Sequence, residues 1–396
     1  MAERTERLLQ IGAGNIGRGL VGSLAHDAGM ELTLADVNPD VIGRLNAERE
    51  YQVVTVSSEG TAEQVVDGVQ AVDVRDRDAF TKAVVEADVI TTAVGPGVLP
   101  KLGPELGAAL TERLRRRPGA DMHVVVVACE NIVDNTDRLK EAVLGSVPDE
   151  TARQMEDLVS FPNCTVDRIV PEHQASDEPL AVTVEDYYHW AVDAEALKQP
   201  MAHIPGLVLS HDLESLQEQK LFTLNTAHAL TAYFGERAGY EYVHEAIQDP
   251  QIRSQVMGAM REIGPVITGR YEAITAIDQR AYAERTLDRF ANPHLQDSLR
   301  RVGRDPIRKL GRSDRLVRPA VLSLSAGETP AHLASGIHAA LTYRNPDDPQ
   351  AAALAQRLAD ESVESILVDV SELEGGHPVV SMVRASVGLE RLSKAA

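Results

Sequence analysis

The segment KLFTLNTAHAL, at residues 220–230, places three polar side chains among apolar ones: Lys220, Asn225 and His228. On an α-helix, which advances by about 100° per residue, Asn225 lies roughly 140° and His228 roughly 80° from Lys220, so they share a face with apolar neighbours. A lysine on such a face loses hydration, and desolvation lowers the pKa of a cation. The spacing therefore favours a general base near neutral pH over an ordinary surface lysine.

These three residue types fit the oxidation of an alcohol to a ketone. Lys220 could accept the hydroxyl proton while a hydride leaves for a nicotinamide. Asn225 could donate a hydrogen bond to the oxygen as charge develops, and His228 could orient a neighbouring hydroxyl. Such a mechanism needs no metal ion, and we predict none.

The segment RLLQIGAGNIGRGL, at residues 7–20, could bind the cofactor of such a reaction. Gly12 allows a tight turn, Gly14 lets backbone N–H groups approach a pyrophosphate, and Gly17 permits close packing of helix on strand. The phosphates then lie at the positive end of a helix that opens at Asn15 and Ile16, which we also expect to contact the cofactor.

Two further residues extend this predicted cofactor site. Asp36 ends a second strand-like run, 24 residues after Gly12, where a carboxylate accepts hydrogen bonds from the ribose of NAD and repels the 2′-phosphate of NADP. Gly95, in TTAVGPG, follows another strand and either covers the cofactor or serves as a plain turn glycine. We therefore predict NAD as the cofactor. Arg18, inside the helix, is expected to lie away from the ribose.

The elements that must position these residues follow from alternating strand-like and helical segments over residues 7–127. This alternation predicts a doubly wound parallel sheet covered on both faces, with residues 57–73 as a small antiparallel excursion. Strand-like runs over residues 161–193 are expected to extend the same sheet, and helical patterns dominate from about residue 213. We predict an α/β fold with a Rossmann-type NAD-binding domain over 1–195 and a mainly helical catalytic domain over 196–396. In RLRRRPG, which begins at Arg113, the cations are expected to end a helix in solvent.

Composition excludes several functional classes. The formal charge of −21 over 396 residues disfavours nucleic acid and anionic membranes as partners. No apolar run approaches the roughly 20 residues that cross a bilayer, and residues 1–10 do not resemble a signal peptide, so a cytoplasmic location is expected. The two cysteines, Cys129 and Cys164, lack the spacing of a zinc site and are expected to be packed thiols.

The chain resembles the polyol-specific long-chain dehydrogenases over essentially its whole length, and within them the members that act on mannitol 1-phosphate. The resemblance is carried by IGAGNIGRG, LTLADVN, TTAVGP, ACEN, VDRIVP, KLFTLNTAHALTAY, RFANP and RVGRDPIRKL. It implies that Lys220 is the general base, that Asn225 and Asn131 donate to the developing oxyanion, and that His228 orients the substrate. It also implies that Arg301 and Lys309 contact the substrate.

The resemblance further implies the reversible oxidation of D-mannitol 1-phosphate to D-fructose 6-phosphate with NAD, by a protein that acts as a monomer. The segment RRVGRDPIRKLGRSDR, at residues 300–315, supplies cations that suit a phosphate within an acidic protein. Where relatives carry an acid three residues before the lysine, this chain has Gln217 followed by Glu218, which leaves any carboxylate proton shuttle open. Asp167 and Arg168 either form an ion pair at the domain junction or contact substrate.

Two alternative functions stay open. One is a related polyol or hexuronate dehydrogenase, of the mannitol 2-dehydrogenase or fructuronate reductase type, and the other is a regulator that binds NAD without turnover. A short-chain dehydrogenase is disfavoured because none of the nine tyrosines has a lysine four residues later. The two cysteines do not supply the ligands of a zinc alcohol dehydrogenase.

Overall fold

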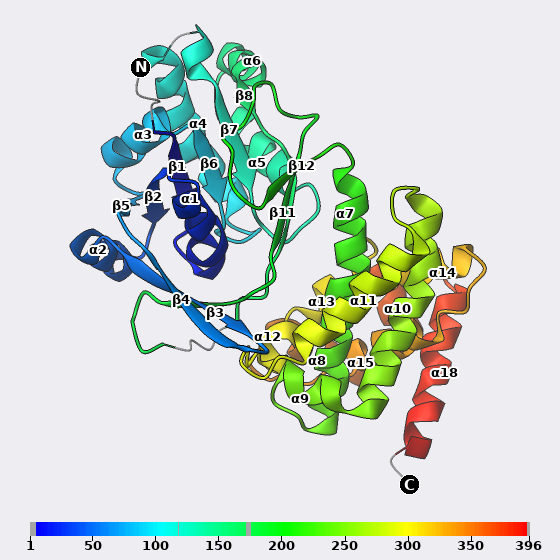
Figure 1. Cartoon of the computed structure of the whole chain (residues 1–396). Coiled ribbons are helices and arrows are strands. Elements are labelled where there is room, and N and C mark those ends of the chain that lie inside the picture. The colour runs from blue at the N-terminus through cyan, green and yellow to red at the C-terminus, as the bar shows by residue number, and fades with distance from the viewer. Residues whose placement is uncertain (1–4, 118, 172–175, 394–396) are drawn as a thin grey trace. The chain divides into compact units, whose positions relative to one another are not determined.

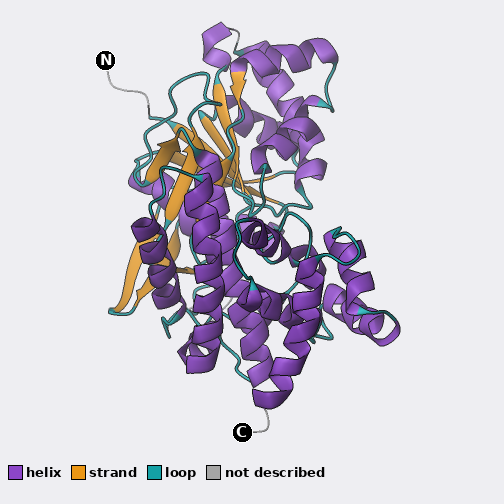
Figure 2. Ribbon diagram, turned by 90° about the vertical axis from the view of Figure 1, so that its right-hand side faces the viewer, coloured by secondary structure: helices purple, strands orange, loops and turns teal. Residues whose placement is uncertain are grey.

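The computed structural model describes residues 5–117, 119–171 and 176–393 (Figure 1). The chain divides into two compact units, Met1–Leu216 and Gln217–Ala396. The first unit is built around β-sheets. In the second unit, the described residues form helices and no named strand, as the ribbon colours of Figure 2 show.

A six-stranded parallel sheet forms the centre of the first unit, in the order β5-β2-β1-β6-β7-β8. Its strands are β1 (Arg7–Ile11), β2 (Glu31–Asp36), β5 (Gln70–Asp73), β6 (Val89–Thr92), β7 (Val124–Ala128) and β8 (Val159–Ser160). The strand order reverses at β1, since β2 lies on one side and β6 on the other. In open α/β sheets, ligands bind outside the carboxyl ends of the strands at such a reversal.

Helices cover both faces of this sheet. Alternate residues of its strands point to opposite sides, and apolar side chains on each side need to be buried. Leu8 packs into one apolar core and its neighbour Leu9 into the other. The helical segments of this unit are a π-helical turn η1 (Gly17–Gly22), α1 (Ser23–Asp27), α2 (Pro39–Glu48), α3 (Arg77–Glu86), α4 (Leu99–Arg116), a 3₁₀ turn η2 (Gly119–Met122), α5 (Asn135–Leu144) and α6 (Asp149–Leu158). The predicted doubly wound α/β fold is confirmed.

Two three-stranded sheets accompany the main one, and they correct the expectation that residues 161–193 extend it. The first has the order β10-β3-β4 and the second β12-β11-β9. Their strands are β3 (Tyr51–Ser57), β4 (Gly60–Val66), β9 (Cys164–Asp167), β10 (Val182–Glu185), β11 (His189–Asp193) and β12 (Leu207–Ser210). Strand-forming residues predict that a strand exists, whereas its partner is chosen by long-range packing. The β3–β4 pair is antiparallel, and β5 returns to the main sheet.

Arg113 also differs from its expected place at a solvated helix end. Its side chain is fully buried, although it lies in the last turn of α4. The guanidinium donates to the carbonyl oxygens of Val84, Val85 and Ala87 at the end of α3 and of Met122 before β7. Carbonyl oxygens in the last turn of a helix receive no hydrogen bond from within that helix. A buried arginine that donates to them therefore has a structural role.

The second unit consists of packed helices. They are α7 (Leu213–Gln219, which begins in the first unit), a π-helical turn η3 (Lys220–Asn225), α8 (Thr226–Ala238), α9 (Val243–Gln248), α10 (Pro250–Arg270), α11 (Ala276–Phe290), α12 (Leu299–Gly303), α13 (Pro306–Lys309), α14 (Val317–Ser325), α15 (Ala331–Leu341), α16 (Pro349–Asp360), α17 (Val363–Ser371) and α18 (Pro378–Ser393). Several begin at conventional signals, such as Asp249 capping α10 with Pro250 in its first turn.

Helix α8 lies at the centre of this unit and packs against α9, α10, α12 and α15. Its residues are buried almost all round, including Leu230, Tyr233 and Phe234. Because η3 leads directly into α8, the turn that carries Lys220 is rigidly attached to the core of the unit. None of the helices among the described residues is both long and apolar enough to cross a membrane.

Candidate active site

The glycine turn between β1 and η1 has the geometry that its sequence predicts. Gly12 has a φ of +94°, and a Cβ there would lie 2.6 Å from the carbonyl oxygen of Ala93. A Cβ on Gly17 would lie 2.0 Å from the carbonyl oxygen of Gly12. Gly14 is exposed, and a Cβ on it would meet nothing within 4 Å. Two glycines thus close the turn, and the third leaves open space where a pyrophosphate could approach.

The helix after this turn begins at Asn15 and Ile16, as expected, but becomes π-helical over Gly17–Gly22. Arg18 was expected to lie away from the ribose, and the structure brings it close enough to Asp36 for the two charges to interact. Its buried guanidinium donates to the carbonyl oxygen of Ala13, and burial lowers its pKa while the charges of Tyr51 and Asp36 partly offset that effect. Arg18 therefore stabilises the glycine turn through its hydrogen bond to Ala13.

Asp36 is fixed at the carboxyl end of β2, beside the glycine turn. One carboxylate oxygen accepts from the N–H of Ala13 at 2.7 Å. The other accepts from the N–H groups of Val37 at 2.7 Å and Asn38 at 2.9 Å. Three backbone donors hold the carboxylate in one orientation, which preorganises it for hydrogen bonds from a ribose.

The loops that follow β6 and β7 are joined by Glu130, a residue that the sequence did not single out. Its buried carboxylate accepts from the hydroxyl of Thr92 at 2.9 Å and from the N–H of Val94 at 2.9 Å. Burial raises its pKa, and those hydrogen bonds oppose the rise. Gly95 follows with a φ of +93°, and Asn131 lies exposed directly after Glu130. Its position beside Asn131 in ACEN was the only sequence signal for Glu130.

Arg168 has a structural environment within the first unit. Its guanidinium donates to the carbonyl oxygens of Gly19 at 2.7 Å and Glu185 at 3.0 Å, and it lies 5.4 Å from the ring centre of Tyr188. These contacts join β10 to the helix after the glycine turn. Arg168 therefore serves the scaffold of the cofactor domain.

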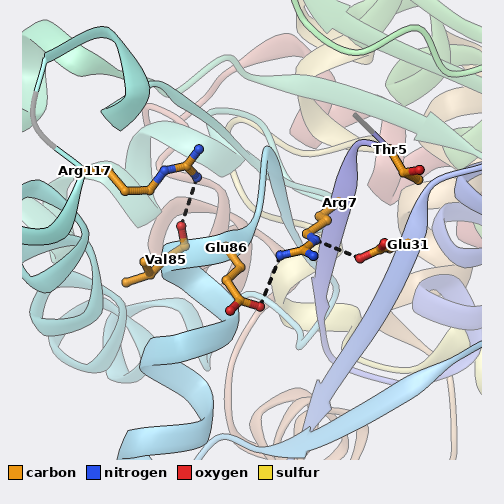
Figure 3. A pocket seen from close by; sticks show the side chains of 6 residues that line it. All are labelled: Thr5, Arg7, Glu31, Val85, Glu86 and Arg117. Atoms are coloured by element: carbon orange, nitrogen blue, oxygen red, sulfur yellow. Dashed lines mark hydrogen bonds and ion pairs between the residues drawn. The ribbon is translucent and has the colours of Figure 1, made fainter. Parts of the chain in front are cut away.

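A surface hollow of about 350 Å³ lies at the opposite edge of the main sheet, where β1 and β2 begin (Figure 3). Arg7 lies between two carboxylates, Glu31 at 2.7 Å and Glu86 at 3.3 Å. Arg117, on the other wall, donates to the carbonyl oxygen of Val85. Because it lies at the opposite ends of the strands from the glycine turn, this hollow is not the predicted cofactor site.

In the second unit, the π-helical turn η3 changes the predicted spacing of Lys220 and Asn225. Hydrogen bonds of a π-helix join residues five apart, so these two residues lie one turn apart on the same side instead of roughly 140° apart. Asn225 is buried and Lys220 is half-buried. Single π-helical turns within α-helices are frequent at functional sites. The π-helical turn thus sets the two residues on one side of the helix, where an α-helix would separate them.

Two polar networks hold the segment that contains this turn. Gln279 of α11, which is buried, accepts from the side-chain amide of Gln219 at 3.0 Å and donates to the hydroxyl of Thr223 at 2.8 Å. It thus bridges the residue before η3 and the middle of η3. The Gln279 side chain was not recognised from the sequence, because no local pattern links it to residues about 60 positions earlier.

Glu218, one residue further back, is held by three donors. Its carboxylate accepts from Arg270 at 2.8 Å, from the hydroxyl of Tyr271 at 2.8 Å and from Arg318 at 2.9 Å. The side chain is buried, and both of its oxygens accept hydrogen bonds. Glu218 therefore anchors α7 to α10 and α14.

His228 lies on α8, beyond the π-helical turn, and its ring is held on two sides. It stacks on Phe290, with ring centres 4.7 Å apart. Its Nε2 lies 3.1 Å from a carboxylate oxygen of Asp297, a residue that the sequence did not single out. Burial lowers the pKa of His228, and the hydrogen bond and charge of Asp297 partly oppose this. The structure also brings Arg301 to this cluster, since its guanidinium binds the same Asp297 at 2.6 Å.

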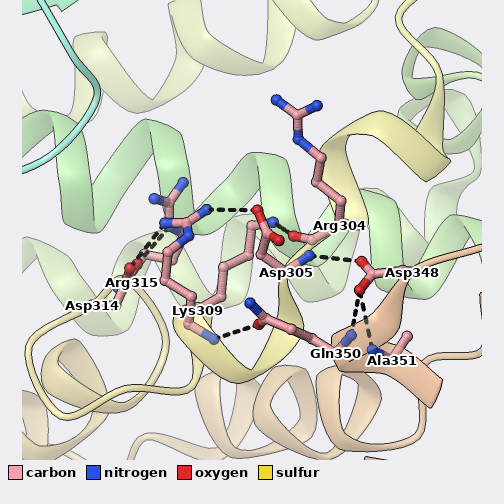
Figure 4. A network of polar contacts seen from close by, with 9 residues as sticks. Arg304, Asp305, Lys309, Asp314, Arg315, Asp348, Gln350 and Ala351 are labelled. Carbon is pink, nitrogen blue, oxygen red and sulfur yellow. Dashed lines mark hydrogen bonds and ion pairs between the residues drawn. The ribbon is translucent and has the colours of Figure 1, made fainter. Parts of the chain in front are cut away.

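Lys309 lies in a separate network of charged side chains at α13 (Figure 4). Its amine is buried and donates to the carbonyl oxygen of Arg304. Burial, and then the charges of Arg315 and Arg308, lower its pKa to about 6. Asp314 balances Arg315 through a hydrogen bond of 2.7 Å. Arg301 and Lys309, predicted as a pair, thus belong to different clusters of this unit.

No group of three or more histidine, cysteine or acidic side chains within the described ranges is arranged to hold a metal ion. Cys129 and Cys164 are both buried and are not joined by a disulfide. The structure thus packs both thiols beside the loop that carries Asn131.

The first unit has the fold and the glycine turn of a dinucleotide-binding domain, and the second carries Lys220 and Asn225 on one π-helical turn. Residues 6–206 match the family model described as the mannitol dehydrogenase Rossmann domain, and residues 212–389 match the mannitol dehydrogenase C-terminal domain. The chain belongs to the mannitol dehydrogenase family.

Solved structures share this fold at low sequence identity. A ternary complex of Pseudomonas fluorescens mannitol 2-dehydrogenase with NAD and D-mannitol is 18% identical, with a TM-score of 0.79 over 98% of this chain and 92% of that one. A substrate-free D-sorbitol dehydrogenase is also 18% identical, with a TM-score of 0.78 over 96% of this chain and 92% of that one. A ternary complex of D-mandelate dehydrogenase with NADH is 12% identical, with a TM-score of 0.50 over 88% and 99% of the two chains.

Proposed function

We propose that this protein oxidises D-mannitol 1-phosphate to D-fructose 6-phosphate with NAD, reversibly and without a metal ion, which is the activity of a mannitol-1-phosphate 5-dehydrogenase. The observation that carries the proposal is the π-helical turn that sets Lys220 and Asn225 on one side of a helix. This turn occurs in a chain whose other domain is the Rossmann domain of the mannitol dehydrogenase family.

The residues of the first unit fit a dinucleotide. Gly12, Gly14 and Gly17 form a turn with open space at Gly14, and the helix that opens at Asn15 and Ile16 directs its N–H groups toward that space. The fixed carboxylate of Asp36 would hold the adenosine ribose of NAD and repel a 2′-phosphate. Gly95 and Asn131 follow the neighbouring strands at the same edge of the sheet. When bound, NAD supplies the hydride acceptor.

Lys220 takes the hydroxyl proton of the alcohol, and the C–H bond of the same carbon breaks with loss of a hydride to the cofactor, which leaves a ketone. Asn225 and Asn131 donate hydrogen bonds to the oxygen, which is most negative in the transition state. His228 orients a neighbouring hydroxyl. In the reverse direction the protonated amine returns its proton to the oxygen. Proximity of Lys220 and Asn225 on one turn supports this division of roles.

The residues proposed to bind the phosphate of the substrate are chosen for their charge. The overall charge of −21 would repel a phosphate, so the molecule needs a local excess of cations to bind one. Arg304, Arg308 and Arg315 occur together around α13 with Lys309 and with three acids, Asp305, Asp314 and Asp348. Arg308 and Arg315 act on the Lys309 amine closely enough to lower its pKa, and this gathering of basic side chains supports Lys309 as a phosphate ligand. Arg301, whose charge Asp297 balances, better suits a sugar hydroxyl.

Competing substrates are distinguished by initial rates of NADH formation. D-Mannitol 1-phosphate, D-mannitol and D-sorbitol would be compared at equal concentration, and reduction of a hexuronate ketose would be followed separately. The solved relatives bind D-mannitol or are named for D-sorbitol, which makes unphosphorylated polyols the second candidate. We expect kcat/KM to be at least ~10²-fold higher with the phosphate, since loss of a charged ligand group costs several kcal/mol. Equal rates with free mannitol would exclude the proposed substrate.

The Lys220→Ala variant distinguishes an enzyme from an NAD-responsive regulator. We expect kcat to fall by roughly 10²- to 10⁴-fold, because the base for the hydroxyl proton is lost. The Kd for NAD, measured by fluorescence titration, should remain close to that of the wild type, because the glycine turn lies in the other domain. Lys101→Ala, in an exposed part of α4, is the matched control. Unchanged kcat in Lys220→Ala would show that Lys220 is not the base.

A further inference from the structure

Asp297 connects two residues that the proposed function places at the substrate. One of its carboxylate oxygens lies 3.1 Å from Nε2 of His228. Both oxygens accept from Arg301, from Nε and from one terminal nitrogen, each at 2.6 Å. The bidentate geometry fixes the plane of the guanidinium relative to the carboxylate. His228 and Arg301 thus share one acceptor.

The carboxylate is buried and ionised. Only 3% of the Asp297 surface is exposed. Burial raises its pKa, but the hydrogen bond from His228 and the charge of Arg301 outweigh burial and lower the pKa to about 2. A carboxylate of this kind is an acceptor only, with no proton to donate at neutral pH. The nitrogen that faces it must therefore carry hydrogen.

This acceptor decides which nitrogen of the His228 ring carries the proton. In the neutral imidazole, one nitrogen is a donor and the other an acceptor. With Nε2 donating to Asp297, Nδ1 is the acceptor and can accept a hydrogen bond from a hydroxyl group. The ring plane is fixed by stacking on Phe290. The charged groups that act on the ring are Asp297, Arg301 and Arg289 of α11, and the two arginines favour the neutral ring.

We infer that Asp297 is a positioning residue, which holds His228 in the Nε2–H tautomer and sets Arg301 in a fixed place beside it. A substrate would then meet an acceptor at His228 and a donor at Arg301, which is the pair needed by two adjacent hydroxyl groups of a polyol. The inference rests on the proposed function for the identity of the substrate, whereas the tautomer depends on the second unit alone.

The direct test is ¹⁵N NMR of ring-labelled histidine in the full chain, with the His228 signals identified by their loss in His228→Gln. We expect the wild-type ring to be neutral at neutral pH, with hydrogen on Nε2 and none on Nδ1. In Asp297→Asn, whose amide can donate as well as accept, the ring should populate both tautomers. A wild-type His228 with hydrogen on Nδ1 would overturn the inference, and this reading needs no folded Asp297→Asn variant.

Kinetics provide the second test. Asp297→Asn should lower kcat with the polyol substrate by ~10- to 100-fold, by analogy with metal-binding histidines that lose the partner that orients the ring. KM for NAD should be unchanged. Asp288→Asn, on the exposed side of α11, is the matched control and should behave as the wild type. A folded Asp297→Asn variant with wild-type kcat and a single His228 tautomer would refute the positioning role.

These outcomes separate the inference from the proposed function. If no polyol phosphate is oxidised but the Nε2–H tautomer is observed and is lost in Asp297→Asn, the substrate assignment is wrong and the role of Asp297 stands. If D-mannitol 1-phosphate is oxidised and His228 is unaffected by Asp297→Asn, the activity stands and the role of Asp297 is wrong.

Discussion

At the scale of single residues, Asp36 is the acid that we propose selects the cofactor. Three backbone N–H groups hold its carboxylate, so the negative charge cannot turn away from a 2′-phosphate. A serine at this position would keep a small acceptor but would lose the charge that disfavours NADP. The discrimination between the two cofactors should therefore depend on this one carboxylate.

The Asp36→Ser variant should raise the ratio of kcat/KM for NADP to that for NAD by ~10- to 100-fold, because charge repulsion of a phosphate is worth one to a few kcal/mol at short range. Initial rates with each cofactor at a saturating concentration of substrate give the ratio. Asp40→Ser, an exposed acid four residues later in α2, is the control. An unchanged ratio in Asp36→Ser would remove Asp36 from the ribose site.

Lys309 allows a pH-linked prediction at the same scale. Burial and two neighbouring arginines lower its pKa to about 6, so the amine is mostly neutral at about pH 7.5. A phosphate bound beside it favours the charged form and raises this pKa, so binding of the substrate should take up a proton. A lysine that is already protonated would take up no proton when the phosphate binds.

Proton uptake is measured by calorimetry in buffers of different ionisation enthalpy, with D-mannitol 1-phosphate binding to the NADH-loaded enzyme, which cannot oxidise it. We expect roughly 0.5 to 1 proton taken up by the wild type and markedly less by Lys309→Met. Arg312→Met, an exposed cation three residues later, is the control. Equal proton uptake by Lys309→Met and the wild type would show that Lys309 does not meet the phosphate.

At the scale of elements, the π-helical turn η3 is the feature that most affects the candidate site. A π-helical turn is less favourable than an α-helical one and persists where its surroundings hold it. Gln279 supplies that support by binding Gln219 and Thr223, and Glu218 fixes the preceding turn through Arg270 and Arg318. The spacing of Lys220 and Asn225 is thus maintained by other helices.

Gln279→Leu keeps most of the side-chain volume and removes both hydrogen bonds to the η3 segment. We expect kcat to fall ~5- to 50-fold, because misplacement of the base by even about 1 Å can cost 10²-fold. Amide hydrogen exchange over residues 219–226 should become faster. Gln251→Leu, at an exposed position of α10, is the control. Wild-type exchange and kcat in Gln279→Leu would show that η3 holds its shape without this bridge.

At the scale of the whole molecule, each unit has its own core, and they can be followed separately. The only tryptophan, Trp190, is fully buried in the core of the first unit. Most of the helical residues lie in the second unit, so far-UV circular dichroism is weighted toward that unit. Tryptophan fluorescence therefore reports the unfolding of the unit that is proposed to bind NAD.

A saturating concentration of NAD should raise the midpoint of the Trp190 fluorescence transition, because a ligand at 100 times its Kd stabilises the native state by about 2.7 kcal/mol. The shift should be smaller in Asp36→Ser at the same concentration of NAD. Thermal unfolding followed by both signals gives the comparison. A midpoint that NAD leaves unchanged in the wild type would contradict binding of the cofactor to this unit.

The sequence by itself determined those features that depend on near neighbours along the chain. The glycine turn needs Gly12 and Gly17 because a Cβ at either position would meet backbone atoms, and apolar β-branched runs form the strands that lead to it. The position of Asp36 at the end of β2 could be predicted from the strand pattern, although its role in cofactor binding stays a prediction, and the α/β class follows from the alternation of elements. For Lys220, Asn225 and His228, spacing and resemblance marked the segment, and their roles stay predictions.

Only the tertiary structure decided which distant segments meet. Asp297 reaches His228 across 69 residues, and Gln279 reaches Gln219 across 60. Strand β10 pairs with β3 instead of extending the main sheet, and η3 is π-helical instead of α-helical. Local patterns could not reveal these features, because each depends on packing and burial between elements whose separation along the chain carries no periodic signal. Local preference selects an element, and long-range packing selects its partners.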